Sequence, residues 1–583
     1  MKHICLTVLA LFTLLTLGAC SKDEDQGTAA QSGSGNELLT YVPADSPYLL
    51  ANLEPVPEEV IDTFLTRLQP VLDTMQSQLT TARQTLEANA VHSDDPGARF
   101  AHALLMEFDG KLSRPGLESM GFDLHSKRVV YGMGAFPVIR LGLSDAQALR
   151  DTIIRVMDNA QITAPEQEFQ GVSYWRLSNE SHTGVSAGLY VSIIGEHLAI
   201  SLFPTMAEAE LLPAFLGLEL PASSNAQARL ENLNKTHGYT GYGSGILDVR
   251  RLADQFMSPD TVAGRAMAGS GEFDPATLSQ VCVSEIHGII DNTPLMTMGI
   301  QELSENAIAV QYRLETPKTL ASQLLGLVAK VPMADVISNR ILEFAFGMRF
   351  GPVRDFLREK ATSIVDAPYQ CEHLADLNDS AVQALEQLNQ PMPPFLNNFR
   401  GVRASLSEIV MNQDSIPENA RGFMAVHVEQ PQMFVGMAQM FLPDLSEQPI
   451  APGEPPIRLP ESLIPVPGMV AFAAMSDNAI GLSLGEGEES GLTAWLDRKA
   501  GTEGMFLSAS YDMAAYLDYS ENMGRHYQGM HENGDSEYAL HAGVVEELRE
   551  AATRAMKQMA DRSYSSMSFT PEGLEIENRT TFK

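Results

Sequence analysis

The chain has 583 residues, of which 44% are hydrophobic and 19% are charged, and its formal net charge is −35. This length allows two or three domains with full cores, and the composition is typical of a globular protein. So acidic a surface repels nucleic acid and anionic headgroups, and we expect neither as a partner. The acidity either keeps the protein soluble or presents an acidic surface to a protein partner.

The N-terminus combines a short basic start with an apolar run. Lys2 and His3 precede the apolar residues 4–17, and the run ends in Leu17-Gly18-Ala19-Cys20. Its length of about 16 apolar positions falls short of the roughly 20 that a spanning helix needs, which favours a cleaved signal peptide over an uncleaved anchor. No later run reaches that length without charges, so we expect no transmembrane helix.

The segment Leu17-Gly18-Ala19-Cys20 resembles the lipobox of bacterial lipoproteins. The resemblance implies that signal peptidase II removes residues 1–19 and that Cys20 carries diacylglycerol, a membrane anchor. Ser21 rather than Asp follows the cysteine, which by analogy implies delivery to the outer membrane with the body in the periplasm. Residues 20–38 are rich in Gly, Ser and charge and are expected to form a flexible tether that reaches roughly 20–25 Å.

The four cysteines agree with export. Cys5 lies in the predicted signal peptide and Cys20 is the predicted lipidation site, which leaves Cys282 and Cys371. In an oxidising compartment these two thiols can form one disulfide, worth up to about 4–5 kcal/mol on the chain-entropy model. Two separately buried thiols are the alternative, because cysteine is among the most buried residue types.

Residues 39–316 are predicted to form a first α+β domain. Asp145 and Asp248 stand where N-caps are expected, each before an amphipathic segment. Residues 70–175 expand this domain. The apolar patterns predict strands at 48–53, 128–143 (a hairpin), 172–177, 188–202 (a hairpin), 243–247, 281–290 and 295–314, and helices at 56–68, 71–89, 98–112, 145–156, 206–216 and 248–257.

Residues 317–412 are predicted to form a helical connector, and residues 413–583 a second, shorter α+β domain. One expected helical stripe comprises Ile337, Ile341, Phe344, Ala345 and Met348. Aromatic residues of the connector either pack between the two domains or line a groove for an acyl chain or a partner's helix; they are Phe344, Phe346, Phe350 and Phe356, together with Met348.

Four pairs of segments in the same order predict an internal duplication. The 42–68 segment, which opens on Val42-Pro43, pairs with 416–443, which opens on Ile416-Pro417. The other three pairs are 190–202 with 470–484, 246–254 with 510–518, and 298–314 with 567–582. The predicted fold is therefore α+β, with two related antiparallel-sheet domains, helices on one face of each, and the connector between them. The body is similar to bacterial envelope lipoproteins with repeated strand–helix units, a resemblance that assigns no functional residue.

The sequence gives only weak indications of catalytic or metal-binding motifs. We expect no nucleophile elbow of the G-x-S-x-G type, and the H-E-x-x-H, S-x-x-K, C-x-x-C and Walker patterns are absent, so no catalytic residue or cofactor is predicted. His526, His531 and His541, with carboxylates between them, form the best metal candidate, for zinc or manganese. Glycines around them also fit a solvated loop that binds nothing.

The function predicted from these observations is binding or scaffolding at the periplasmic face of the outer membrane, with an envelope protein as a possible partner. One alternative is a carrier of a hydrophobic ligand that uses the connector. Another is an unrecognised hydrolase whose paired carboxylates meet only in the fold. A carrier requires an apolar cavity, and a hydrolase requires a cleft with converging carboxylates or histidines.

Overall fold

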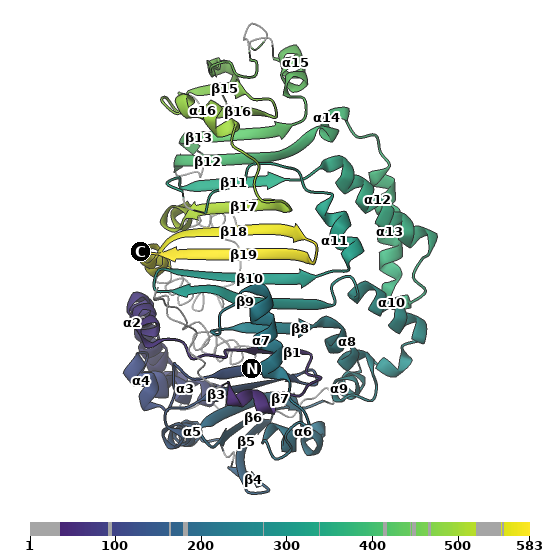
Figure 1. Cartoon of the computed structure of the whole chain (residues 1–583). Coiled ribbons are helices and arrows are strands. Elements are labelled where there is room, and N and C mark those ends of the chain that lie inside the picture. Colours follow the sequence, from purple (N-terminus) through teal and green to yellow (C-terminus); the bar gives the residue numbers. More distant parts are fainter. Residues whose placement is uncertain are drawn as a thin grey trace.

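The structure is a computed structural model that describes residues 35–90, 96–162, 165–178, 185–271, 273–336, 338–411, 417–442, 445, 450–464, 468–519, 550 and 553–583. Helices and strands are mixed along the chain, and the strands form one 19-stranded sheet (Figure 1). The fold class is therefore α+β, built on a large antiparallel sheet.

Each strand pairs with its neighbours in antiparallel fashion. The spatial order from one edge to the other is β4 (Gln167–Phe169), β5 (Val172–Ser178), β6 (Ala187–Ile194), β7 (His197–Pro204), β3 (Phe136–Gly142), β2 (Arg128–Met133), β1 (Tyr48–Ala51), β8 (Ser244–Asp248), β9 (Leu295–Ser304), β10 (Ala307–Glu315), β19 (Gly573–Phe582), β18 (Ala560–Thr570), β17 (Met505–Asp512), β11 (Leu342–Gly347), β12 (Phe399–Met411), β13 (Pro417–Val428), β16 (Ala479–Leu484), β15 (Ala471–Met475) and β14 (Ile457–Arg458).

The pairing order is the same on both sides of the central β10–β19 pair. Outward from β10 come β9, β8, β1, β2, β3, β7, β6 and β5; outward from β19 come β18, β17, β11, β12, β13, β16, β15 and β14. Strands at equivalent places also follow one another in the same chain order. We refer to β1–β10 as the N-terminal half and to β11–β19 as the C-terminal half.

Helices cover both faces of the sheet, which we define by β1: the front face carries Leu49 and the back face carries Leu50. On the front lie α6 (Glu208–Phe215), α7 (Ala226–His237) and α16 (Glu489–Leu496); on the back lie α2 (Glu58–Ala90), α3 (Pro96–Phe108) and α5 (Ala146–Asn159). The strand ends on one side carry α8 (Val249–Met257), α9 (Val262–Ser270), α10 (Gln280–Ile290), α11 (Lys318–Leu325), α12 (Phe350–Asp366) and α13 (Ala375–Leu388) (Figure 1).

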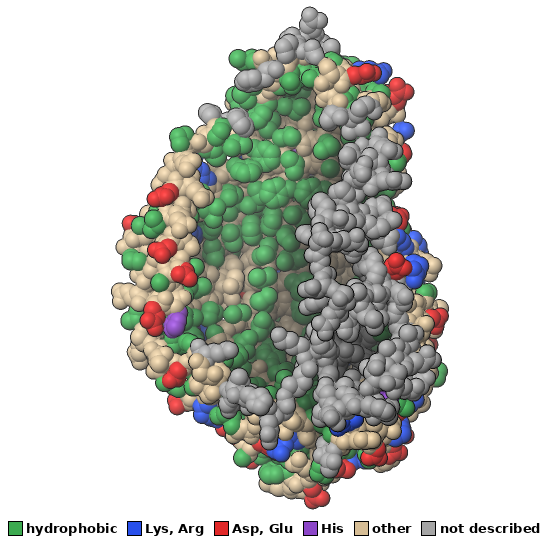
Figure 2. Space-filling model, turned by 180° about the vertical axis from the view of Figure 1, so that it is seen from behind, with side chains coloured by type: hydrophobic (Ala, Val, Ile, Leu, Met, Phe, Trp, Pro, Cys, Tyr) green, Lys and Arg blue, Asp and Glu red, His purple; other side chains and the backbone are tan. Residues whose placement is uncertain are grey.

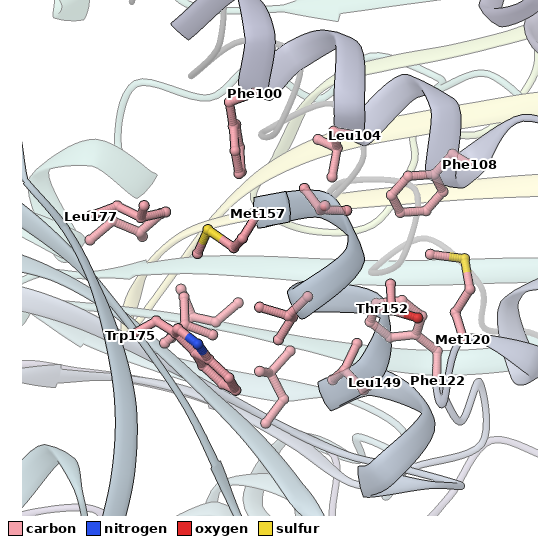
Figure 3. Close-up of a pocket in the computed structure, with 16 residues that line it drawn as sticks. Phe100, Leu104, Phe108, Met120, Phe122, Leu149, Thr152, Met157, Trp175 and Leu177 are labelled. Atoms are coloured by element: carbon pink, nitrogen blue, oxygen red, sulfur yellow. The ribbon is translucent and has the colours of Figure 1, made fainter. Parts of the chain in front are cut away.

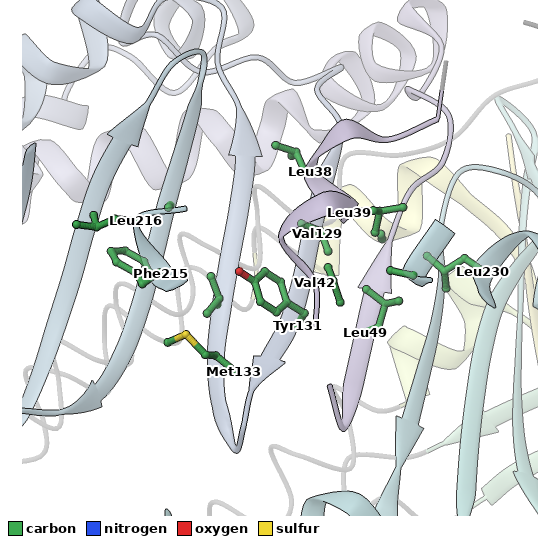
Figure 4. Packing of buried hydrophobic residues seen from close by; sticks show 14 of the residues in the cluster. Leu38, Leu39, Val42, Leu49, Val129, Tyr131, Met133, Phe215, Leu216 and Leu230 are labelled. Atoms are coloured by element: carbon green, nitrogen blue, oxygen red, sulfur yellow. The ribbon is translucent and has the colours of Figure 1, made fainter. Parts of the chain in front are cut away.

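The front face of the N-terminal half is an apolar core. Leu49 and Tyr131 from the strands pack with Phe215 of α6 and Leu230 of α7, all at most 1% exposed (Figure 4). One charge lies inside: the guanidinium of Arg140 stacks 3.8 Å from the Tyr41 ring centroid and donates a 2.7 Å hydrogen bond to the Phe215 carbonyl. A buried cation is tolerated there because its donors have partners.

Several predictions made from the sequence are confirmed. The hairpins expected within 128–143, 188–202 and 295–314 are β2–β3, β6–β7 and β9–β10. Asp145 caps α5 by accepting from two backbone N–H groups, and Asp248 caps α8 by accepting from Arg251 N. These elements were predictable because alternation and capping are local signals.

The prediction of a helical connector was wrong. Residues 317–412 contain α11, α12 and α13, but also the central strands β11 and β12, so one sheet runs through the place where a break was expected. The stripe that included Phe344 and Ala345 lies in β11, where the side chains alternate between the two faces. Helices on both faces also replace the predicted one-sided arrangement.

Three smaller predictions also need correction. Residues 281–290 form helix α10 rather than a strand, since Ser279 caps the helix and Cys282 lies in its first turn. The two helices expected within 56–89 are one helix, α2, with Pro70 inside it. The partner expected for the segment that opens on Val42-Pro43 is not at 416–443, because Pro417 lies in β13, which occupies the place equivalent to β3.

A different valine–proline pair precedes the strand equivalent to β1. Val331-Pro332 leads into β11 as Val42-Pro43 leads into β1, and the two valines are 1% and 0% exposed. The other three matched pairs lie at equivalent places in the pairing order: β6–β7 with β15–β16, β8 with β17, and β9–β10 with β18–β19.

Cys282 and Cys371 form a disulfide between α10 and the start of the 3-10 helix at Glu372–Leu374. Glu285 on α10 supports the junction, because its carboxylate accepts hydrogen bonds from the backbone N–H groups of Gln370 and Cys371. The bond joins a helix that follows β8 to the segment that follows β11, and so ties the two halves together. Among the described helices, none has the length and apolarity that a membrane crossing requires.

Candidate functional site

The back face of the sheet carries an unbroken row of apolar residues. Cross-strand partners stand on the same face, so a chain of partners can be followed from strand to strand. From β5 to β15 this row, which we call the apolar row, crosses 17 strands and contains only hydrophobic residues and one glycine: Trp175, Val191, Ile200, Ile139, Val130, Leu50, Gly245, Met298, Tyr312, Ile576, Met567, Leu507, Phe346, Val402, Val426, Ile480 and Met475.

Part of this row is open to solvent, and most of its other members are partly exposed. Leu50 is 40% exposed, Tyr312 39% and Val426 40%, and Met424 beside the row is 48% exposed. Figure 2 shows the same face as a hollowed field of hydrophobic side chains that extends over much of the molecule. Adjacent strands lie about 4.8 Å apart, so the row extends over roughly 75 Å.

In the C-terminal half the usual division between buried and exposed side chains is inverted. In β11, Glu343 is 6% exposed on the front face, whereas Phe344 and Phe346 on the back face are partly exposed. The same holds in β17, where Ser508 and Ser510 are fully buried and the neighbouring Leu507 is half-buried. An apolar face that is left open while polar residues are buried needs a partner or a function.

Two of the buried charged residues of the front face have hydrogen-bond partners. Glu343 accepts from the Asp335 backbone N–H at 2.9 Å and from the Ser405 hydroxyl at 3.3 Å. Arg403 donates to the Trp495 carbonyl at 3.1 Å and stacks 4.1 Å from the ring centroid of the same residue. Burial lowers the pKa of Arg403 to about 10. These bonds explain how the front face stays closed, and so why the apolar side chains must point to the back.

At the N-terminal end the row enters a half-open apolar pocket of about 200 Å³, which we call the cavity (Figure 3). Trp175, Val191 and Ile200 of the row form part of its floor on β5, β6 and β7. Its roof comes from α3 and α5. The full lining is Phe100, Leu104, Phe108, Met120, Phe122, Leu149, Thr152, Ile153, Val156, Met157, Trp175, Leu177, Leu189, Val191, Leu198 and Ile200.

Thr152 is the only hydroxyl-bearing residue of that lining, and its Oγ1 already accepts a 2.9 Å hydrogen bond from Arg155. The cavity therefore offers a ligand almost nothing but dispersion contacts. Cavities of this kind stay dry and take up apolar molecules. What the lining can hold is the hydrocarbon part of a ligand.

The site residues predicted from the sequence fall elsewhere or outside the described residues. Cys20, His526, His531 and His541 all lie outside them. Within the described ranges, no three His, Cys, Asp or Glu side chains are grouped closely enough to hold a metal ion.

The aromatic residues of the predicted connector are divided between two elements. Phe344 and Phe346 lie on the back face of β11, whereas Phe350 and Phe356 belong to α12. The apolar row itself was missed, because it emerges only once the register of 17 strands is known. Its local signal is the period-two alternation of residues 342–347, 402–406 and 422–428.

The letters G-x-S-x-G do occur, as Gly184-Val185-Ser186-Ala187-Gly188. In a nucleophile elbow the serine follows a strand and opens a helix. Ser186 instead stands immediately before β6, and its carbonyl accepts a hydrogen bond from the Thr205 backbone N–H at 2.9 Å. Ser186 therefore lies at the start of a strand and not in the strand-to-helix turn of a nucleophile elbow.

Comparison with protein-family models, with curated protein sequences and with solved structures found no match to this chain. The functional assignment therefore rests on the geometry of the back face.

Proposed function

We propose that this protein binds the hydrocarbon chains of an amphiphilic ligand along the back face of its sheet, and that it does so at the bacterial cell envelope. The observation that carries the proposal is the apolar row, exposed or partly exposed over most of its length and continuous with an apolar cavity at one end. Soluble proteins rarely leave contiguous apolar surface of this size uncovered unless it binds something.

The dimensions suit lipid chains. One leaflet of a bilayer is about 15 Å of hydrocarbon, half of the roughly 30 Å core, so the roughly 43 Å between Leu50 and Val426, the outermost exposed residues of the row, can hold more than one chain end to end. Unbranched chains also suit an open strip, because they need dispersion contacts along their whole length and no hydrogen bonds. Of the functions that the sequence leaves open, the carrier of a hydrophobic ligand agrees best with this geometry, with the sheet rather than a helical connector as the site.

The envelope location is part of the proposal and rests on the lipobox. Lipidation of Cys20 would hold the body at the outer membrane, on its periplasmic face, through a tether of residues 20–38. There the protein could receive its ligand from the membrane or from an envelope protein partner. Nucleic acid is not among the proposed partners.

We also propose that the two halves arose by duplication of one strand–helix unit. The support is the identical pairing order outward from β10–β19 and the Val-Pro pair before both β1 and β11. A duplicated unit whose back face is apolar would double the length of the binding strip. Fusion through the β10–β19 pair then makes the strip continuous.

The binding proposal is tested with the delipidated mature chain and a fluorescent fatty-acyl probe. Met424→Glu and Val426→Glu place charges in the open part of the strip, where both side chains are already exposed, so folding should be unaffected. We expect the pair of substitutions to weaken probe binding about tenfold or more, since a chain would have to desolvate both carboxylates.

Leu220→Glu is the matched control, because Leu220 is 56% exposed and lies outside the strip. It should leave binding unchanged. Probe binding that is absent in the parent protein, or equal in all three proteins, would contradict the proposal.

The anchor is tested separately in cells. Inhibition of signal peptidase II should accumulate a heavier precursor, and Cys20→Ser should accumulate one that also carries no diacylglycerol. Normal maturation under either condition would remove the envelope part of the proposal and leave the binding part standing.

A further inference from the structure

Within this acidic chain, one pocket collects basic side chains. It lies where β11, β12 and β13 end, has a volume of about 430 Å³, and is lined by Val328, Ala329, Lys330, Arg349, Arg400, His427, Val428, Glu429 and Asn478. Three cations face one carboxylate there, against a net charge of −35 for the whole chain. We call it the rim pocket.

Two of the three cations have no acidic partner among the described residues. Arg400 forms an ion pair with Glu429 and donates to the Asn397 and Phe399 carbonyls at 2.8 Å. Arg349, by contrast, makes one hydrogen bond, to the Gly326 carbonyl at 3.1 Å, and no carboxylate in the described ranges pairs with it or with Lys330. The pocket therefore keeps uncompensated positive charge, which favours an anion.

Lys330 and Arg349 are held in place by their backbones. The segment before β11 pairs with the segment after it: Ala329 N donates to the Gly347 carbonyl, and Arg349 N donates to the Leu327 carbonyl at 2.8 Å. The two positive side chains thus stem from adjacent, hydrogen-bonded backbone rather than from independent loops. A ligand would not have to order this part of the pocket.

A buried histidine adds an independent observation. His427 lines the pocket and is 4% exposed, yet its Nε2 has no hydrogen-bond partner. Burial, with the nearby charge of Arg403, lowers the pKa of His427 to about 4, so the imidazole is neutral near pH 7. A neutral imidazole can donate one hydrogen bond, and a buried polar atom without a partner is costly, so the His427 side chain adds polarity but no charge to the pocket wall.

The rim pocket adjoins the apolar row. The row crosses these same strands at Phe346, Val402 and Val426, and Arg349 stands three residues beyond Phe346. At about 3.3 Å per strand residue, the backbone of Arg349 lies roughly 10 Å from Phe346 along the strand direction, just past the end of β11. A headgroup and the first carbons of its chain can cover that distance.

We infer that the rim pocket binds the anionic headgroup, a phosphate or a carboxylate, of the amphiphile whose chains lie on the back face. The inference rests on the proposed function and gives its ligand a chemical class. Lys330 and Arg349 are the donors, and charge-assisted hydrogen bonds make such contacts strong. The rest of the surface is acidic and repels anions, so an anionic headgroup is attracted to the pocket and repelled elsewhere.

The test uses the delipidated mature chain and three probes: a lysophosphatidic acid, the uncharged monoacylglycerol with the same chain, and inorganic phosphate. Lys330→Gln with Arg349→Gln removes the two free cations, and both residues are exposed, so the fold should tolerate the change. We expect this variant to bind the lysophosphatidic acid at least about tenfold more weakly and the monoacylglycerol unchanged.

Lys235→Gln with Arg458→Gln removes the same charge far from the pocket in sequence and should alter neither affinity. Binding of both amphiphiles with equal losses, or with no loss, would overturn the headgroup site and leave the proposed function intact. Phosphate binding that depends on Lys330 and Arg349, without binding of either amphiphile, would overturn both proposals in favour of a free-anion site. Absence of binding by all three probes would also overturn both.

Discussion

The two halves of the sheet share one pairing order but use their back faces differently. In the N-terminal half α5 lies on the strands and buries Trp175 and Leu198, with 2% and 4% exposure. In the C-terminal half the equivalent helix α15 (Pro431–Phe441) leaves Val426 and Met424 at 40% and 48% exposure. The same kind of apolar strand surface is thus core in one half and available surface in the other.

The front faces of the two halves also differ in the side chains that they bury. The N-terminal half buries large apolar side chains such as Tyr190 and Phe203, whose rings stack 3.8 Å apart. The C-terminal half buries Phe423, Leu492 and Leu496 at α16, but also serines and the Arg403–Trp495 stack. Apolar side chains that stay exposed on the back face contribute less to the folding free energy than they would if they were buried. We take this as the strongest physical reason to seek a ligand for the back face.

The largest expected effect compares two members of the apolar row. Trp175→Ala should lower the free energy of unfolding by about 3–5 kcal/mol, because it empties a buried site under α5. Val426→Ala should change it by less than about 0.5 kcal/mol, because that side chain is already exposed. Urea denaturation followed by circular dichroism measures both. Equal costs would mean that the C-terminal back face is covered in solution.

The next effect concerns the disulfide that joins the halves. Cys282→Ser with Cys371→Ser should lower the free energy of unfolding by about 2–4 kcal/mol, since the bond closes a loop of 88 intervening residues. The measurement is denaturant unfolding with and without reductant. The parent protein should lose the same amount when reduced, and the double variant should be insensitive to reductant. A parent protein that is equally stable in both conditions would show that the bond is not formed.

The sequence predicts local structure well and the long-range arrangement poorly. The hairpins β2–β3 and β9–β10 follow from alternation around tight turns. Residues 342–347 were assigned to a helix because Ile341, Phe344, Ala345 and Met348 also fit a helical stripe, and short apolar runs fit both periods. That β10 pairs with β19 is set by contacts more than 250 residues apart, and no local pattern carries them.

The candidate site was hidden for the same physical reason. Each strand contributes one or two ordinary apolar residues to the back face, and only the register aligns them into a row. The rim pocket is equally non-local, since Lys330, Arg349, Arg400 and His427 come from three strand ends and one preceding segment. Besides the alternation of those strands, Phe344 and Phe346 were a local hint, and a role for them in binding an acyl chain stays a prediction.

A third prediction uses the two buried histidines. Burial lowers the pKa of His197 and of His427 to about 4, against 6.5 for an unperturbed imidazole. The unfolded chain therefore takes up protons at a higher pH than the folded one. The free energy of unfolding should fall as the pH drops from about 6.5 to about 4, and this contribution should level off below that.

The halves should differ here too. His197 Nε2 lies 3.0 Å from Arg140 Nη1, whereas His427 Nε2 has no partner. His197→Phe should remove part of the pH dependence and also lower stability at pH 7, because it deletes a buried polar contact. His427→Phe should remove part of the pH dependence without that loss. Unfolding curves at pH 7.5, 6 and 4.5 measure this; identical slopes in parent and variants would contradict the assignment.

The smallest expected effect concerns the helix that closes the N-terminal back face. Asp145 caps α5 by accepting from Gln147 N and Ala148 N at 2.9 and 3.0 Å, whereas α15 in the other half begins without a side-chain cap. Asp145→Ala should cost about 1 kcal/mol of stability. Because α5 also roofs the 200 Å³ cavity, the variant should bind a small apolar fluorophore more weakly while the affinity for a long acyl chain on the open strip is nearly unchanged. Asp145→Asn keeps a capping side chain and should behave as the parent does. A loss of both affinities in Asp145→Ala would mean that the cavity and the strip form a single site, and that closure by α5 governs the whole back face.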